Sequence, residues 1–249
     1  MTGAEERKDT GARRSETMDV KVLLEKENIA KVLIKGTNTA FVNALRRQIM
    51  SGIPILSIDD VHIYENNGAM HDEMLCQRLS LIPLRMDAKS YKEGEKVKLV
   101  LEKEGPCTVY SKDIKSTDPK IEPADLNVPI TKLAEGHRLR LEMDAAIGSG
   151  KMHSKWQAAI ASYQELPTIV NDKGTKDKTY KADILEMLLD EKQRDIILKE
   201  GQAIEYDPTT FIFTIESHGN LTPKELFAAA IETLKAKCED FRRELKNLS

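Results

Sequence analysis

The chain has 249 residues, enough for one large domain or two small ones. Apolar residues (40%) and charged residues (32%) are balanced as in a soluble globular protein, and a net charge of −3 gives no electrostatic reason to expect a free-standing nucleic-acid binder. No apolar run approaches the ~18 residues of a membrane span, and the widely spaced Cys76, Cys107 and Cys238 favour a reducing cytoplasm over a disulfide framework.

The first part of the chain predicts a tail and a β-hairpin. Residues 1–17 are polar, and we expect them to be disordered. Apolar residues alternate with polar ones over residues 20–24, which is typical of a half-buried strand. Residues 25–28 then predict a turn, and residues 29–35 predict the second strand of the hairpin.

An amphipathic helix follows. Thr37 or Asn38 can cap its start, and Gly52 and Pro54 end it. Its apolar residues recur at helical spacing on one face: Phe41, Ala44, Leu45 and Ile49. Two further elements come next, a strand over residues 53–64 and a short helix over residues 71–79.

The composition changes near Arg85, which predicts a separate middle part. Alternating residues indicate strands near residues 97–101, 108–110, 139–143 and 211–215, and helical spacing indicates a helix over residues 183–198. The simplest account is an α+β protein. A discontinuous domain, residues 18–84 and 209–249, would combine an antiparallel sheet with two long helices, and a mainly β domain, residues 85–208, would be inserted into it.

The last element is a long helix with a well-specified start. Thr222 can act as its N-cap, Pro223 as its first residue and Glu225 as the carboxylate of a capping box. Its apolar residues are spaced alternately four and three apart, as in a coiled-coil seam: Phe227, Ile231, Leu234, Cys238, Phe241, Leu245 and Leu248. A helix of roughly 25 residues is about 37 Å long. The apolar seam is therefore either buried against the chain's own core or left partly exposed as a binding site for a helix of another chain.

No stretch of the sequence predicts an active site. Residues 145–152 resemble half of a phosphate-binding loop, but Ala145 stands in place of a glycine and Met152 in place of a Ser or Thr. Asp60, His62 and His71 could form a metal site with two histidines and a carboxylate, although such residues more often cap turns or fill structural positions. A stand-alone metalloenzyme built on these three residues is therefore the alternative hypothesis from a different functional class.

Three blocks of sequence resemble the assembly-subunit family of cellular RNA polymerases, which includes the bacterial α subunit and its archaeal and eukaryotic counterparts. The first lies between Thr37 and Leu84 and contains Asn43-Ala44-Leu45-Arg46-Arg47, Ile53-Pro54, Ile58-Asp59-Asp60-Val61, Asp72-Glu73, Arg78-Leu79 and Ile82-Pro83-Leu84. The second, residues 148–156, is similar to the G-x-G-x-x-H-x-K-W loop of archaeal and eukaryotic members, and the third is residues 211–221 with the long helix behind them. The archaeal branch fits best.

This resemblance implies a function and a set of partners. We expect a non-catalytic assembly subunit of DNA-dependent RNA polymerase, which pairs with the smaller subunit L and carries the large catalytic subunits. The resemblance implies a partner-binding seam of Phe41, Leu45, Ile49, Phe227, Ile231, Leu234, Phe241 and Leu245. It also implies that five charged residues contact the large subunits or organise turns: Arg46, Arg47, Asp72, Glu73 and Arg78. A homodimeric scaffold, as in bacterial relatives, is a third hypothesis.

The sequence departs from part of this family in its cysteines. Many archaeal members carry an insertion with iron–sulfur clusters, and some eukaryotic relatives bind zinc through clustered cysteines. Here the corresponding segment, residues 171–208, has no cysteine. Three separated cysteines cannot supply a four-thiolate site. We therefore expect no iron–sulfur cluster, no zinc and no other cofactor.

Overall fold

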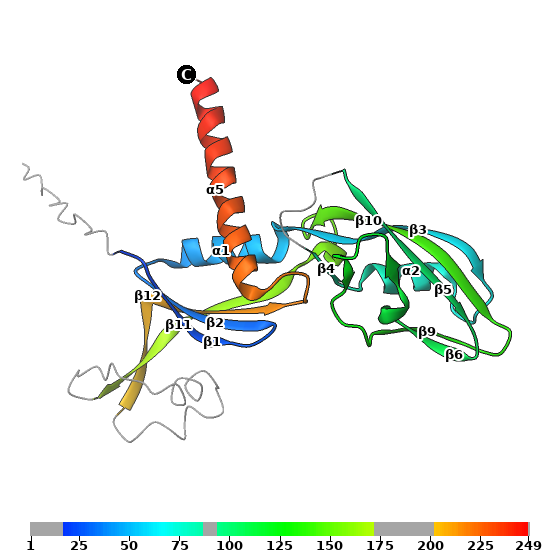
Figure 1. Ribbon diagram of the computed structural model, residues 1–249. Helices are drawn as coiled ribbons and strands as arrows, with labels where there is room; N and C mark the ends of the chain where they lie inside the picture. The colour runs from blue at the N-terminus through cyan, green and yellow to red at the C-terminus, as the bar shows by residue number, and fades with distance from the viewer. Residues whose placement is uncertain (1–16, 87–93, 172–201, 249) are drawn as a thin grey trace, which may run out of the picture.

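The chain folds into antiparallel sheets and helices, as the α+β prediction states (Figure 1). The computed structural model describes residues 17–86, 94–171 and 202–248. The described helices are α1 (Thr39–Ser51), α2 (Asp72–Ser80) and α5 (Pro223–Asn247), with short 3-10 turns η1 (Ser111–Asp113) and η2 (Ser154–Trp156). The predicted tail, the predicted helix over residues 183–198 and most of the cysteine-free segment lie outside the described residues.

The described strands form two larger sheets and two small ones. They are β1 (Asp19–Glu25), β2 (Ile29–Lys35), β3 (Pro54–Asn66), β4 (Leu84–Arg85), β5 (Lys96–Glu104), β6 (Cys107–Tyr110), β7 (Lys115–Ser116), β8 (Glu122–Pro123), β9 (Pro129–Leu133), β10 (Arg138–Ser149), β11 (Ala159–Asn171) and β12 (Gln202–Ser217). The strand orders of the larger sheets are β1-β2-β12-β11 and β3-β10-β5-β7. The predicted hairpin is confirmed, because β1 pairs antiparallel with β2.

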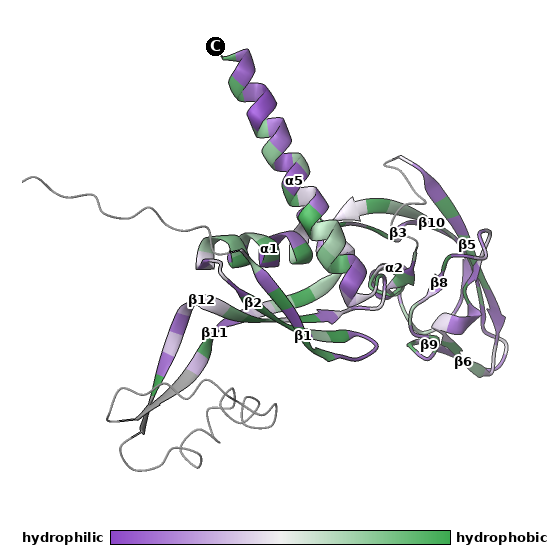
Figure 2. Ribbon diagram, turned by 60° about the vertical axis from the view of Figure 1, so that its left-hand side comes forward, coloured by the Kyte–Doolittle hydropathy of each residue, from purple (hydrophilic) through white to green (hydrophobic). Residues whose placement is uncertain are grey.

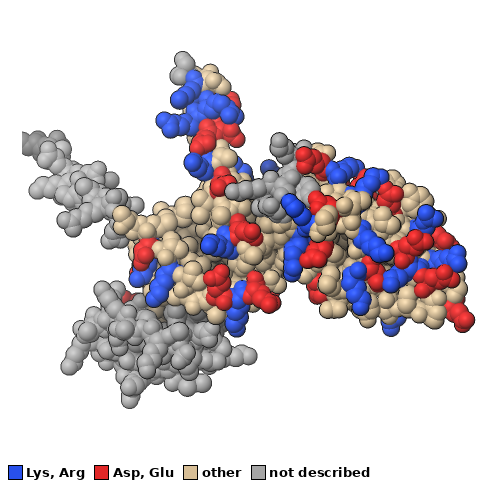
Figure 3. Space-filling view, viewed as in Figure 1, with Lys and Arg blue, Asp and Glu red and all other residues tan. Residues whose placement is uncertain are grey.

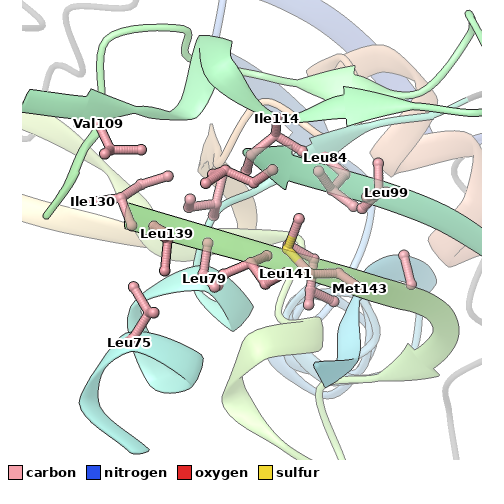
Figure 4. Packing of buried hydrophobic residues seen from close by; sticks show 14 of the residues in the cluster. Leu75, Leu79, Leu84, Leu99, Val109, Ile114, Ile130, Leu139, Leu141 and Met143 are labelled. Atoms are coloured by element: carbon pink, nitrogen blue, oxygen red, sulfur yellow. The ribbon is translucent and has the colours of Figure 1, made fainter. Parts of the chain in front are cut away.

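Each large sheet contributes one face to a hydrophobic core. The α1/α5 core lies between the sheet of β2, β11 and β12 and the helices α1 and α5, and Phe211 and Phe213 are fully buried in it. The α2 core lies between the sheet of β3, β5 and β10 and helix α2, with Leu75, Leu141 and Met143 fully buried (Figure 4). Two cores of this kind follow from the alternation of apolar residues along the strands.

The long strand β3 belongs to both cores. Ile55 at its start is buried in the α1/α5 core, whereas Leu56 and Ile58 are buried in the α2 core. Helix α2 also packs in the α2 core, and β11 pairs with β12 in the other sheet. The chain therefore passes from one core to the other near residue 55 and back again between residues 147 and 156. The expected domain bounds stay a prediction.

Candidate partner-binding surface

An apolar hollow lies where β1, β2, α1 and α5 meet. This groove has a volume of about 380 Å³. Ten of its twelve lining residues are apolar: Met18, Val20, Val22, Ala30, Val32, Ile34, Phe41, Leu45, Phe227 and Ile231. The two charged residues are Glu25 and Lys224. In the space-filling view the surface over α1 shows few charged side chains, whereas the β3, β5 and β10 side is densely charged (Figure 3).

Helix α1 forms one wall of this groove, and its position follows from its caps. The side chain of Asn38 accepts a hydrogen bond from the backbone N–H of Phe41 at 3.0 Å, and Gly52 ends the helix. Phe41 is half-buried in the groove wall. Leu45 is buried beneath it, and Ile49 is enclosed by the chain's own core. Ile49 therefore supports the surface from within and leaves no side-chain area for a partner.

Helix α5 forms the opposite wall and then leaves the body of the molecule (Figures 1 and 2). The predicted capping box is confirmed, because Thr222 and Glu225 each hydrogen-bond the other's backbone N–H. In the first turns Leu226 and Ala230 are fully buried, and the ring of Phe227 lies 5.4 Å from that of Phe213. This end of the helix is therefore held by the chain's own core.

Beyond Leu234 every described residue of α5 is exposed. We call the apolar seam from Ile231 onward the α5 stripe; it consists of Ile231, Leu234, Cys238, Phe241, Leu245 and Leu248. Ile231 is 52%, Phe241 67% and Leu245 50% exposed. A contiguous apolar stripe that its own chain leaves open is typical of a site for another helix.

Strand β1 adds two surface residues that are not among the predicted seam residues. Val20 and Val22 point into the groove and are 58% and 55% exposed. The predicted strand is confirmed, but its predicted half-burial is wrong, because every residue of β1 except Leu24 is exposed. Alternation alone cannot show whether the chain itself covers the apolar face of a strand, which is why it does not single out the two valines.

The G-x-G-x-x-H-x-K-W loop joins the two cores. The indole N–H of Trp156 donates to the carbonyl oxygen of Ala146 at 3.1 Å, and the Lys155 ammonium lies 2.6 Å from Asp59 and 4.3 Å from the centre of the indole ring. A Cβ atom on Gly148 would lie 2.4 Å from the indole. A Cβ atom on Gly150 would lie 2.6 Å from the carbonyl oxygen of Met50. Close packing therefore explains both glycines without phosphate binding.

Comparison with known proteins gives this groove a family context. Residues 31–238 match the model of the RNA polymerase Rpb3/Rpb11 dimerisation domain. The chain is 34% identical to the DNA-directed RNA polymerase subunit Rpo3 of Pyrococcus furiosus, with 93% of this chain and 98% of the relative aligned. It is 34% identical to the Rpo3 of Methanosarcina acetivorans (93% and 100% aligned) and 35% identical to that of Natronomonas pharaonis (91% and 97% aligned).

The chain belongs to the archaeal Rpo3 family of RNA polymerase subunits. The family resemblance predicted from the sequence is therefore confirmed. The matched region of this Rpo3-family chain runs from β2 through most of α5, so it includes both helical walls of the groove. Among the described residues, no helix has the length and apolar content needed to cross a membrane.

The five charged residues expected to meet large subunits have different surroundings in this Rpo3-family chain. Arg78 donates to the carbonyl oxygens of Ile130 (2.9 Å) and Pro129 (2.6 Å), which ties α2 to β9. Asp72 accepts a hydrogen bond from Asn66 at 2.6 Å within the turn before α2.

The other three charged residues lie on helix surfaces. Arg46 donates to Asn43 at 3.1 Å and to the sulfur of Met50 at 3.1 Å, so its guanidinium is held along α1. Arg47 on α1 and Glu73 on α2 are exposed. Contact with another subunit stays a prediction for all five.

The residues of the alternative metal hypothesis are not gathered into a site. Asp60 on β3 pairs with Lys96 at 2.7 Å, and the hydrogen bond and charge of this lysine hold the pKa of Asp60 below its usual value. His62 lies on the same strand, and His71 occupies the N-cap position of α2. Within residues 17–86, 94–171 and 202–248, no three His, Cys, Asp or Glu side chains form a group that could hold a metal ion.

Proposed function

We propose that this chain is a non-catalytic assembly subunit of an archaeal DNA-dependent RNA polymerase. It pairs with the smaller subunit L through the groove and the α5 stripe, and it presents other surfaces to the large catalytic subunits in the cytoplasm. The observation that carries the proposal is the exposure of the stripe. Its outer half projects from the body, and every described residue beyond Leu234 is exposed.

The surface for subunit L consists of the stripe residues and the groove that continues them. The predicted seam residues Phe41, Phe227, Ile231, Leu234, Phe241 and Leu245 are its contact residues, and Leu45 and Ile49 hold α1 in place beneath them. Val20 and Val22 extend the surface onto β1. Burial of a fully exposed large apolar side chain contributes about 1.5–3 kcal/mol, so several half-exposed ones suffice for a stable pair after the costs of association.

We also propose that the subunit works without an iron–sulfur cluster or zinc. The full sequence has three cysteines, one fewer than a four-thiolate site needs. These lie on different elements, Cys76 on α2, Cys107 on β6 and Cys238 on α5. Metal analysis of the purified chain tests this part of the proposal, and a stoichiometric metal would contradict it.

Co-expression with subunit L and a mass measurement in solution test the main proposal. We expect a one-to-one complex with the unmodified chain. Phe241→Asp removes about 1–2 kcal/mol of burial, since 67% of this residue is exposed, and it also places a carboxylate in the contact. We expect the affinity for subunit L to fall at least ~10-fold.

The matched control is Ala236→Asp, which adds the same charge to an exposed position on the opposite face of the helix. We expect this variant to bind subunit L as the unmodified chain does. Equal retention of subunit L by both variants would contradict the stripe as the contact. A stable homodimer of the unmodified chain that does not bind subunit L would favour the hypothesis of a homodimeric scaffold instead.

A further inference from the structure

The charges beside the α5 stripe are mostly of one sign. In the heptad register of the stripe, Lys235 and Arg242 lie directly along one side, and Lys237 and Glu244 lie along the other. All four are exposed. The stripe is thus flanked by three cations and one carboxylate, although the whole chain has a net charge of −3.

The chain itself neutralises these flanking cations only weakly. The Lys235 ammonium is 4.0 Å from Glu239, and both side chains are largely exposed, so their attraction is small. Lys237 donates to the neutral amide oxygen of Gln48 on α1 at 2.8 Å. Helix α1 contains no acidic residue and carries Arg46 and Arg47. The positive charge beside the stripe is therefore available to a partner.

A second copy of this chain would be a less complementary partner for the stripe than an acidic helix. In a parallel pair of α5 helices, Lys237 of one copy would face Arg242 of the other. In an antiparallel pair, Lys235 and Arg242 would face each other along one side, whereas Lys237 and Glu244 would face each other along the other. Both arrangements therefore place like charges together along at least one side of the apolar contact, and neither has the fully complementary borders that an acidic partner helix would provide.

We propose that the flanking cations select a partner helix whose apolar seam is bordered mainly by Asp and Glu, in preference to a second copy of this chain. This inference rests on the proposed pairing with subunit L and specifies the chemistry of the subunit L contact. The stripe provides the affinity, and the flanking charges decide which helix it accepts.

A competition experiment tests this inference. Equal amounts of the unmodified chain and of the double variant Lys235→Glu/Arg242→Glu compete for limiting subunit L, and native mass spectrometry measures the ratio of the two heterodimers. We expect a preference of about tenfold or more for the unmodified chain at about 50 mM salt, and a preference of about twofold at about 500 mM salt, because salt screens exposed charges.

The matched control is Arg243→Glu/Lys246→Glu. It replaces one arginine and one lysine on the same helix, away from the stripe, and we expect a ratio near one. A ratio near one for the Lys235→Glu/Arg242→Glu variant, with subunit L bound to both chains, would overturn the charge selection and leave the proposed function intact. No heterodimer with the unmodified chain would overturn the proposed function and this inference with it.

Discussion

Gly148→Ala is expected to lower the free energy of unfolding by disturbing the packed joint between the two cores, which is the loop of residues 148–156. The added Cβ would lie 2.4 Å from two indole carbons of Trp156 and 2.8 Å from its ring nitrogen. An ordinary contact is about 3.5 Å or more, so the indole must move by about 1 Å. That shift would stretch the 3.1 Å hydrogen bond from the indole N–H to Ala146 beyond its useful range.

Two terms give the size of this effect. Overpacking a buried site costs about 1–3 kcal/mol. Loss of a buried hydrogen bond costs about 1 kcal/mol or more. The expected loss in the free energy of unfolding is therefore about 2–4 kcal/mol, a large part of the ~5–15 kcal/mol typical of a folded domain.

Urea unfolding followed by fluorescence measures this loss directly, because Trp156 is the chain's single tryptophan and is buried. Gly68→Ala is the control, since its nearest neighbour would be 3.3 Å from the added Cβ. We expect the control to lose less than ~1 kcal/mol. A Gly148→Ala variant within ~0.5 kcal/mol of the unmodified chain would refute the assignment of residues 148–156 as a packed joint.

Two further predictions concern charged side chains. Arg78→Ala should reduce the free energy of unfolding by about 1–3 kcal/mol, because two carbonyl oxygens lose their donor; an unchanged urea midpoint would contradict this. The hydrogen bond and charge of Lys98 hold the pKa of Glu142 below its usual value. The ion pair therefore stabilises the fold at neutral pH and is lost as the pH falls through this lowered pKa, so Lys98→Met should raise the Glu142 pKa in an NMR titration.

Much of this architecture could be predicted from short-range signals in the sequence. The capping residues Asn38 and Thr222 mark the helix starts that the structure has, because each side chain satisfies a specific backbone N–H. Alternation likewise indicates β1, β2, β5 and β10. These signals depend on neighbours a few residues away, which a single sequence displays directly.

The contacts between segments that are far apart in the sequence could not be predicted in the same way. Strand β3 changes from one core to the other between Ile55 and Leu56, because consecutive side chains of a strand point to opposite faces. The local composition does not indicate that the two residues belong to different cores. The seam of α5 likewise does not reveal that Leu226 and Ala230 are buried by the chain itself while Phe241 stays open. Whether an apolar face is buried depends on the element that packs against it, and the spacing of apolar residues in the sequence does not identify that element.

The open half of α5 has a consequence for how much of this chain a cell can make. An uncovered apolar stripe is an aggregation hazard in a crowded solution, and its hazard grows with the concentration of unpaired chain. A partner that binds only the folded form stabilises it in proportion to the logarithm of the free partner concentration. Balanced synthesis of the two subunits would therefore protect this chain, and overproduction of it alone should yield insoluble protein.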